Sequence, residues 1–222
     1  MATSDESWSA KLRTIGDLDR PDHWHLTADD VCYFFGEYTA GAGYAHSRTN
    51  SIIKNLKKNP SLRNTVQWQH KQTTIRDCGA AIAANIKQDH LPQVAFVPIP
   101  PSKCQGNPGY DDRVTQIARA ISPKADVREI IYSTTDRDAM HAGQVRRDPN
   151  ALRSILSIRH NLINNHPTYA VLLDDMLTTG CKFTVCKAML TKVWPNTSIV
   201  GIFIARRAIP KLRGVVDLDL DF

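Results

Sequence analysis

The chain has 222 residues, 42% of them hydrophobic, which suits one domain with a real core and leaves room for a large extension. A net charge of +6 favours anionic partners such as phosphorylated small molecules, nucleotides or nucleic acid. No apolar run is long enough to span a membrane, and the five scattered cysteines form no C-x-x-C pair. We therefore expect a cytoplasmic protein with free thiols.

The first ninety residues carry mainly helical patterns. Thr27-Ala28-Asp29-Asp30 before an apolar run is typical of a capping box and predicts a short helix over residues 31–35. Residues 47–60 have one apolar face and four cations, which we interpret as an amphipathic helix with a solvated basic side rather than a nucleic-acid contact. Apolar spacing predicts another helix over residues 73–86.

A pair of histidines, His23 and His25, flanks Trp24 before these helices. Two histidines with no nearby cysteine or third ligand are poor evidence for a metal site. We interpret them as structural residues.

Residues 94–98 predict the first core strand, which leads into a proline-rich loop. The prolines fix an extended backbone at the end of the strand, and Ser102 and Lys103 then add a hydroxyl and a cation. Either a rigid surface turn or an anion-binding loop explains this composition. A helix over residues 111–121 should follow.

A strand over residues 127–132 precedes a polar stretch, 133–150, that has no periodicity. It contains Arg137, Arg146 and Arg147. Loops of this length are usually functional or disordered, so we consider both a lid that closes over an anion and an unrelated loop.

The most informative stretch begins at Tyr169 with a buried strand, followed by the acidic pair Asp174 and Asp175. Thr178-Thr179-Gly180 then forms a loop before a helix that Pro195 ends. Unpaired N–H groups at a helix start, two hydroxyls and a glycine suit a phosphate. Carboxylates accept from sugar hydroxyls or hold a hard cation, so the whole arrangement suits a ribose 5-phosphate.

Residues 171–182 resemble the phosphoribosyl-pyrophosphate (PRPP) motif of type I phosphoribosyltransferases, closest to the ComF-like branch. Lys182 replaces the threonine that often closes the motif, and Gly109-Tyr110-Asp111 replaces the Arg-Gly pair frequent in that branch. The resemblance implies that Asp174 and Asp175 bind the ribose, with Mg²⁺ reached through ligand or water. It implies a 5-phosphate site at Met176, Leu177, Thr178, Thr179, Gly180 and Lys182.

The same resemblance implies a pyrophosphate loop and a set of catalytic cations. Pyrophosphate would bind Pro100, Pro101, Ser102 and Lys103, and the leaving group would be stabilised by Lys103, Arg137 and Arg147. The polar stretch 133–150 is similar in position to the family's mobile loop. Residues 1–90 would form a hood over the substrate's base.

We therefore expect an α/β fold, with a mostly parallel sheet flanked by helices and an N-terminal helical extension. The extension would cover residues 1–90 and the phosphoribosyltransferase-like domain residues 91–222, with a homodimer left open. The expected function is Mg²⁺-dependent transfer of a phosphoribosyl group from PRPP to a nitrogen acceptor, such as a nucleobase, with release of pyrophosphate. A PRPP- or nucleotide-sensing regulator without catalysis, or a competence-type DNA-handling protein, are the alternatives.

Overall fold

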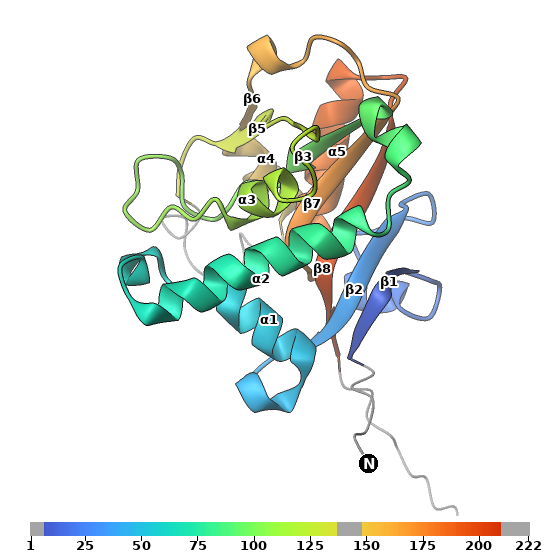
Figure 1. The fold of residues 1–222 in the computed structure, drawn as a ribbon. Helices are drawn as coiled ribbons and strands as arrows, with labels where there is room; N and C mark the ends of the chain where they lie inside the picture. The colour runs from blue at the N-terminus through green and yellow to red at the C-terminus, as the bar shows by residue number, and fades with distance from the viewer. Residues whose placement is uncertain (1–6, 137–147, 210–222) are drawn as a thin grey trace, which may run out of the picture.

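The computed structural model describes residues 7–136 and 148–209, which form an α/β fold around a six-stranded sheet (Figure 1). The strand order is β1-β2-β8-β7-β3-β4, and every neighbouring pair is parallel except β1 with β2. The strands are β1 (Trp8–Thr14), β2 (Cys32–Thr39), β3 (Val94–Pro98), β4 (Asp126–Val127), β7 (Tyr169–Leu177) and β8 (Ser198–Ala208). A separate antiparallel pair joins β5 (Ile131–Ser133) to β6 (Leu156–Ile158).

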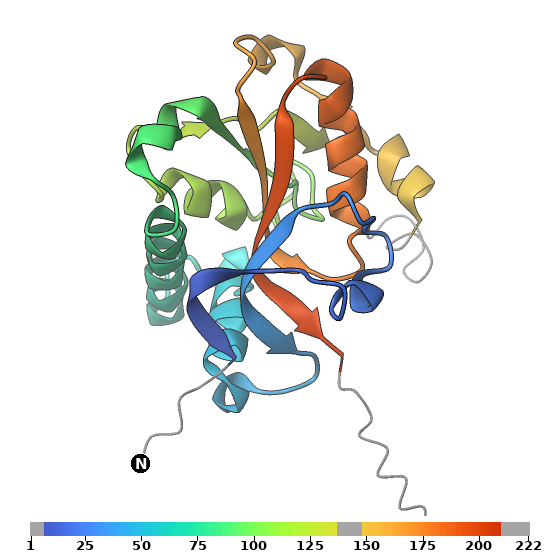
Figure 2. The same ribbon diagram turned by 90° about the vertical axis from the view of Figure 1, so that its right-hand side faces the viewer.

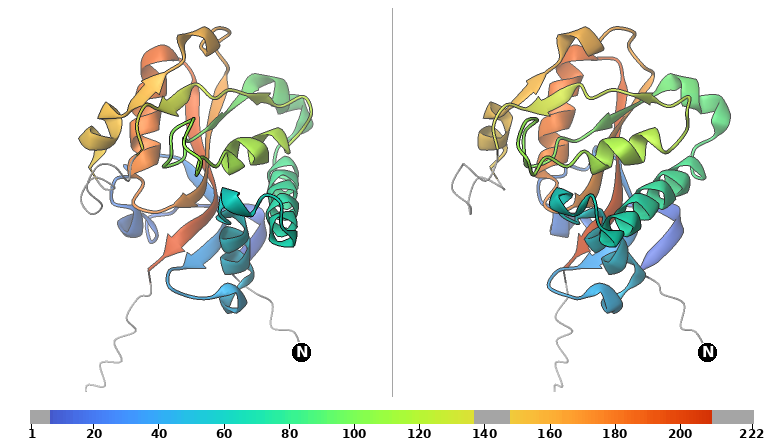
Figure 3. Two further views of the ribbon diagram at one scale, coloured as in Figure 1. Left: turned by 90° about the vertical axis from the view of Figure 1, so that its left-hand side faces the viewer. Right: turned by 60° about the vertical axis from the view of Figure 1, so that its left-hand side comes forward.

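Helices cover both faces of the sheet, as the views in Figures 2 and 3 show. On one face, α1 (Arg48–Leu56), α2 (Val66–Ala83) and α3 (Arg113–Arg119) contribute to one hydrophobic cluster. On the other, α4 (Pro149–Ser154) and α5 (Cys181–Val193) contribute to a second. Short 3-10 helices are η1 (Arg20–His23), η2 (Tyr44–His46), η3 (Pro60–Leu62), η4 (Gln88–Gln93) and η7 (His160–Leu162).

The mostly parallel sheet and its flanking helices confirm the general fold class. The expected helices over 47–60, 73–86 and 111–121 correspond to α1, α2 and α3, although α2 begins earlier, at Val66. No helix in the described ranges combines the length and apolarity needed to cross a membrane.

The helix predicted over residues 31–35 is wrong, because residues 32–35 begin strand β2, which pairs in parallel with β8. Phe34 packs into one hydrophobic cluster and Phe35 into the other, as successive residues of a strand do. Asp30 accepts hydrogen bonds from the backbone N–H and hydroxyl of Thr27, so the expected capping residues close a turn instead. The N-terminal part is therefore not purely helical: β1 and β2 join the main sheet.

Strand β7 is longer than the sequence suggests. Its pairing with β3 ends at Leu173, opposite Pro98, but its pairing with β8 continues to Leu177. Asp174 and Asp175 therefore lie within strand β7. They are beyond the end of β3 on one side and alongside β8 on the other. This arrangement places both carboxylates at the carboxyl edge of the parallel strands, where ligands bind in open α/β sheets.

Candidate functional site

The Thr178-Thr179-Gly180 loop joins β7 to α5. Gly180 caps the helix with a φ of +87°, and a Cβ there would lie 2.8 Å from side-chain atoms of Leu26. Both the left-handed backbone and the lack of space favour glycine. The Cys181 N–H donates to the Thr179 hydroxyl over 3.4 Å, while Thr178 is exposed. The loop thus brings two hydroxyls and the start of α5 together.

The N-terminal segment forms one wall of this loop. The Nδ1 of the fully buried His23 contacts the Thr178 carbonyl oxygen, and the His25 N–H donates to the Thr179 carbonyl oxygen over 2.9 Å. Burial lowers the pKa of His23, so its neutral imidazole donates through Nδ1. Through this contact His23 supports the loop.

Arg206, near the end of β8, holds the same segment in place. Its guanidinium lies 2.9 Å from Asp19, 3.4 Å from Asp22 and 2.8 Å from Glu37. Asp19 is the N-cap of the 3-10 helix η1, and Asp22 lies within this helix directly before His23. The sheet therefore fixes the segment that supports the loop.

Asp174 is 3% exposed and pairs with a cation from α5. Its Oδ1 accepts from the Asp175 N–H over 2.9 Å, and its Oδ2 forms an ion pair with the Lys182 ammonium. Burial raises the pKa of Asp174, opposing the effect of Lys182. The carboxylate is thus buried, and within the described part of the chain Lys182 is the side-chain cation that pairs with it.

Asp175 is 2% exposed and pairs with cations from α3 and the end of α1. Its Oδ2 accepts from Nε and Nη2 of Arg113 over 2.8 and 2.7 Å, and Lys57 lies 3.9 Å away. Burial alone would raise the pKa of Asp175, but Arg113, followed by Lys57 and Lys182, holds it well below its usual range. The two adjacent acids therefore have opposite pKa shifts.

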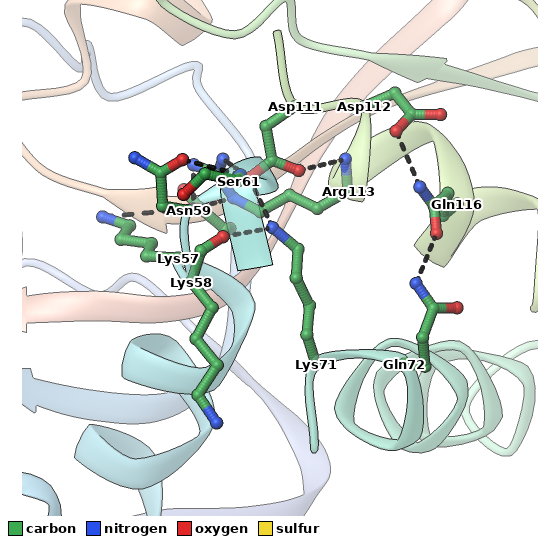
Figure 4. A network of polar contacts seen from close by, with 11 residues as sticks. Lys57, Lys58, Asn59, Ser61, Lys71, Gln72, Asp111, Asp112, Arg113 and Gln116 are labelled. Carbon is green, nitrogen blue, oxygen red and sulfur yellow. Dashed lines mark hydrogen bonds and ion pairs between the residues drawn. The ribbon is translucent and has the colours of Figure 1, made fainter. Parts of the chain in front are cut away.

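Arg113, which pairs with Asp175, belongs to a polar network among the helices that Figure 4 shows around Lys71, Asp111 and Arg113. The Arg113 guanidinium also donates to Asp111 over 2.8 Å, and the fully buried Lys71 donates to the same oxygen over 2.6 Å. Lys71 donates further to the Lys58 carbonyl oxygen over 2.9 Å. This network connects α1, α2 and α3 to the acidic pair.

The proline-rich loop lies beside this site because β3 neighbours β7. The Ile99 N–H donates to the Leu173 carbonyl oxygen over 2.8 Å, which continues the strand pairing into the loop. Ser102 is exposed, and the Lys103 ammonium lies 4.0 Å from Asp136. The Cys104 N–H donates to Asp136 over 2.7 Å and lowers the pKa of that carboxyl.

The structure brings the predicted loops to one edge of the sheet, with two adjustments. Met176 and Leu177 have buried side chains and belong to β7, so the loop proper starts at Thr178. Lys182, expected to face a phosphate, pairs with Asp174. Arg137, Arg146 and Arg147 lie outside the described residues.

Sequence reasoning missed the cations that neutralise Asp175. Arg113 is 62 residues away in the chain, and no local pattern links it to the acidic pair. The one available signal was general: buried carboxylates require partners, and Arg113 begins the helix that follows the proline-rich loop.

The fold and site define an α/β protein with a strand–loop–helix suited to anions at the carboxyl edge of its sheet. No family model matches the chain, and no curated protein matches it.

Proposed function

We propose that the protein is a phosphoribosyltransferase that uses PRPP. One observation carries the proposal: the buried carboxylates Asp174 and Asp175 lie at the end of β7, directly before the Thr178–Gly180 loop that caps α5. Residues 171–182 resemble the PRPP motif of type I phosphoribosyltransferases, whose fold is compatible with this sheet. A sugar phosphate needs hydroxyl acceptors and an anion site side by side.

In this proposal each part of the site binds one part of PRPP. Thr178, Thr179 and the first N–H groups of α5 hold the 5-phosphate, while Asp174 and Asp175 accept hydrogen bonds from the ribose hydroxyls. Ser102 and Lys103 bind the pyrophosphate from the neighbouring loop. Displacement at C1 of the ribose passes through an oxocarbenium-like state, so positioning and charge stabilisation supply most of the acceleration.

Both carboxylates are ion-paired and nearly inaccessible, so they fit Mg²⁺ only through the ligand's own oxygens or water. Direct ligation would place two more positive charges beside Lys182 and Arg113. When bound with PRPP, Mg²⁺ would neutralise the departing pyrophosphate. The side chains of the protein would orient the sugar and hold its phosphate.

The test is incubation with Mg²⁺, PRPP and a panel of nucleobases, with pyrophosphate release as the readout. The reverse assay combines nucleoside 5-monophosphates with pyrophosphate and follows PRPP formation. Activity that requires both PRPP and one base, and that Asp174→Asn with Asp175→Asn abolishes, would support the proposal. PRPP binding without turnover on any acceptor would favour a non-catalytic sensor on the same site.

The nucleic-acid alternative depends on the cations around α1, and these contact protein groups. Lys57 faces Asp175, Lys58 donates to the Gln67 carbonyl oxygen over 3.1 Å, and Lys54 lies over the Tyr44 ring. This pairing favours the small-molecule interpretation. Salt-dependent DNA binding that survives Asp174→Asn would reverse that preference.

A further inference from the structure

Lys182 is the second residue of α5, at the position where the PRPP motif often has a threonine. A cation in the first turn of a helix faces the positive end of the helix dipole, which is unfavourable. The ion pair between its ammonium and Asp174 offsets this cost, and the side chain is 29% exposed. The lysine therefore depends on an anion at the site.

The same ion pair blocks the role proposed for Asp174. One oxygen of this buried carboxylate accepts from the Asp175 N–H; the other has no hydrogen-bond partner among the described residues but is in ion-pair contact with the Lys182 ammonium. A sugar hydroxyl that approaches Asp174 must therefore compete with an ammonium already in contact. A sugar hydroxyl also makes a charge-assisted bond to a carboxylate, but it carries no positive charge to neutralise it, so a free sugar would compete poorly with the ammonium.

We propose that Lys182 exchanges partners when a phosphate binds. In the ligand-free protein it neutralises Asp174; when a phosphate occupies the Thr178–Gly180 loop, the ammonium moves to the phosphate and frees Asp174 for a sugar hydroxyl. Lys182 lies in the first turn of α5, directly after the Thr178–Gly180 loop, on a long flexible side chain. This inference rests on the proposed function and makes Lys182 a specificity residue that selects sugar phosphates over free sugars.

The chain offers a matched control pair on the same helix. Lys187 pairs with Asp30 over 2.6 Å, with side-chain exposures of 27% and 3%, against 29% and 4% for Lys182 and Asp174. Asp30 accepts from the Thr27 N–H and hydroxyl and so closes the Thr27 turn. Lys187→Met therefore reports the cost of losing a comparable ion pair without touching the proposed exchange.

The test is a double-mutant cycle on the affinity for inorganic phosphate, measured by calorimetry. Lys182→Met should weaken phosphate binding about tenfold, whereas Lys187→Met should change it less than about twofold. Asp174→Asn should tighten phosphate binding several-fold, because Lys182 no longer has to leave a competing carboxylate. In the Lys182→Met background, Asp174→Asn should have almost no effect.

A second measurement uses the unsubstituted protein and the ammonium signals of its lysines in nitrogen-edited NMR. Phosphate should shift the Lys182 signal and leave the Lys187 signal in place. Equal tightening by Asp174→Asn with and without Lys182 would indicate simple charge repulsion and overturn the exchange, as would an unshifted Lys182 signal. If the exchange is overturned in this way but PRPP still binds, the proposed function remains intact. A protein that binds neither phosphate, ribose 5-phosphate nor PRPP would overturn both the exchange and the proposed function.

Discussion

The Nδ1 of His23 contacts the backbone carbonyl oxygen of Thr178 across 155 residues of sequence. The histidine is fully buried, and Arg206 fixes the segment that carries it through Asp19 and Asp22. A turn from the N-terminal part therefore sets the position of the proposed phosphate loop. The contact has a consequence for stability, because a histidine can gain a proton.

Acid should destabilise the protein through His23. Burial lowers its pKa in the folded state, so the unfolded chain binds the proton more readily. The contribution of neutral His23 is fully present above the ordinary value of about 6.5 and is lost as the pH falls below it. Urea unfolding at pH 7.5 and 5.5 should show a smaller loss of stability for His23→Gln than for the unsubstituted protein. Equal losses would show that His23 does not titrate on unfolding.

Gly180→Ala should weaken phosphate binding and cost more stability than φ strain alone. An L residue in the left-handed region costs about 1–2 kcal/mol, and the new Cβ would also meet Leu26 at 2.8 Å. Gly41→Ala is the control, because Gly41 has a φ of +82° with open space around its missing Cβ. Chemical denaturation and calorimetry with a nucleoside 5-monophosphate measure the two effects. Identical behaviour of both variants would argue against a tight loop at Gly180.

Arg113→Met should be strongly destabilising because it leaves Asp175 buried without its main partner. Breaking one side of a buried ion pair typically costs about 3–5 kcal/mol. Arg119, on the same helix, pairs with Glu129 over 2.9 Å but is 62% exposed, so Arg119→Met should cost less than about 1 kcal/mol. Unfolding free energies of the two variants provide the measurement. Adding Asp175→Asn to Arg113→Met should recover part of the loss, and no recovery would contradict the pairing.

The parts of the fold that sequence could predict depend on local patterns. The buried run of β7, the Thr178–Gly180 loop and α5 are contiguous, and each has its own signal. The local pattern predicts a helix over residues 31–35, whereas the strand that forms from Cys32 onward depends on pairing with β8, more than 160 residues later in the chain. Arg113 and His23 reach the site only through the tertiary fold, so no local spacing could assign them.

The pairing of the carboxylates could not be predicted either. The sequence places Lys182 eight residues after Asp174, but which anion it faces depends on the extension of β7 and the start of α5. Burial of both acids follows from β8 continuing beside β7 after β3 has ended. The strand, loop and helix that form the candidate site were therefore readable from the sequence, whereas the ion pairing of its carboxylates was not.

The most direct test of the account compares PRPP with pyrophosphate as ligands of the Asp174→Asn, Asp175→Asn double variant. Loss of charge-assisted hydrogen bonds to two ribose hydroxyls should weaken PRPP binding by about 2–4 kcal/mol, while ribose-free pyrophosphate loses much less. Calorimetry with both ligands on the variant and the unsubstituted protein gives the two differences. Equal losses for PRPP and pyrophosphate, or PRPP binding that the double substitution leaves unchanged, would contradict a ribose site at the acidic pair.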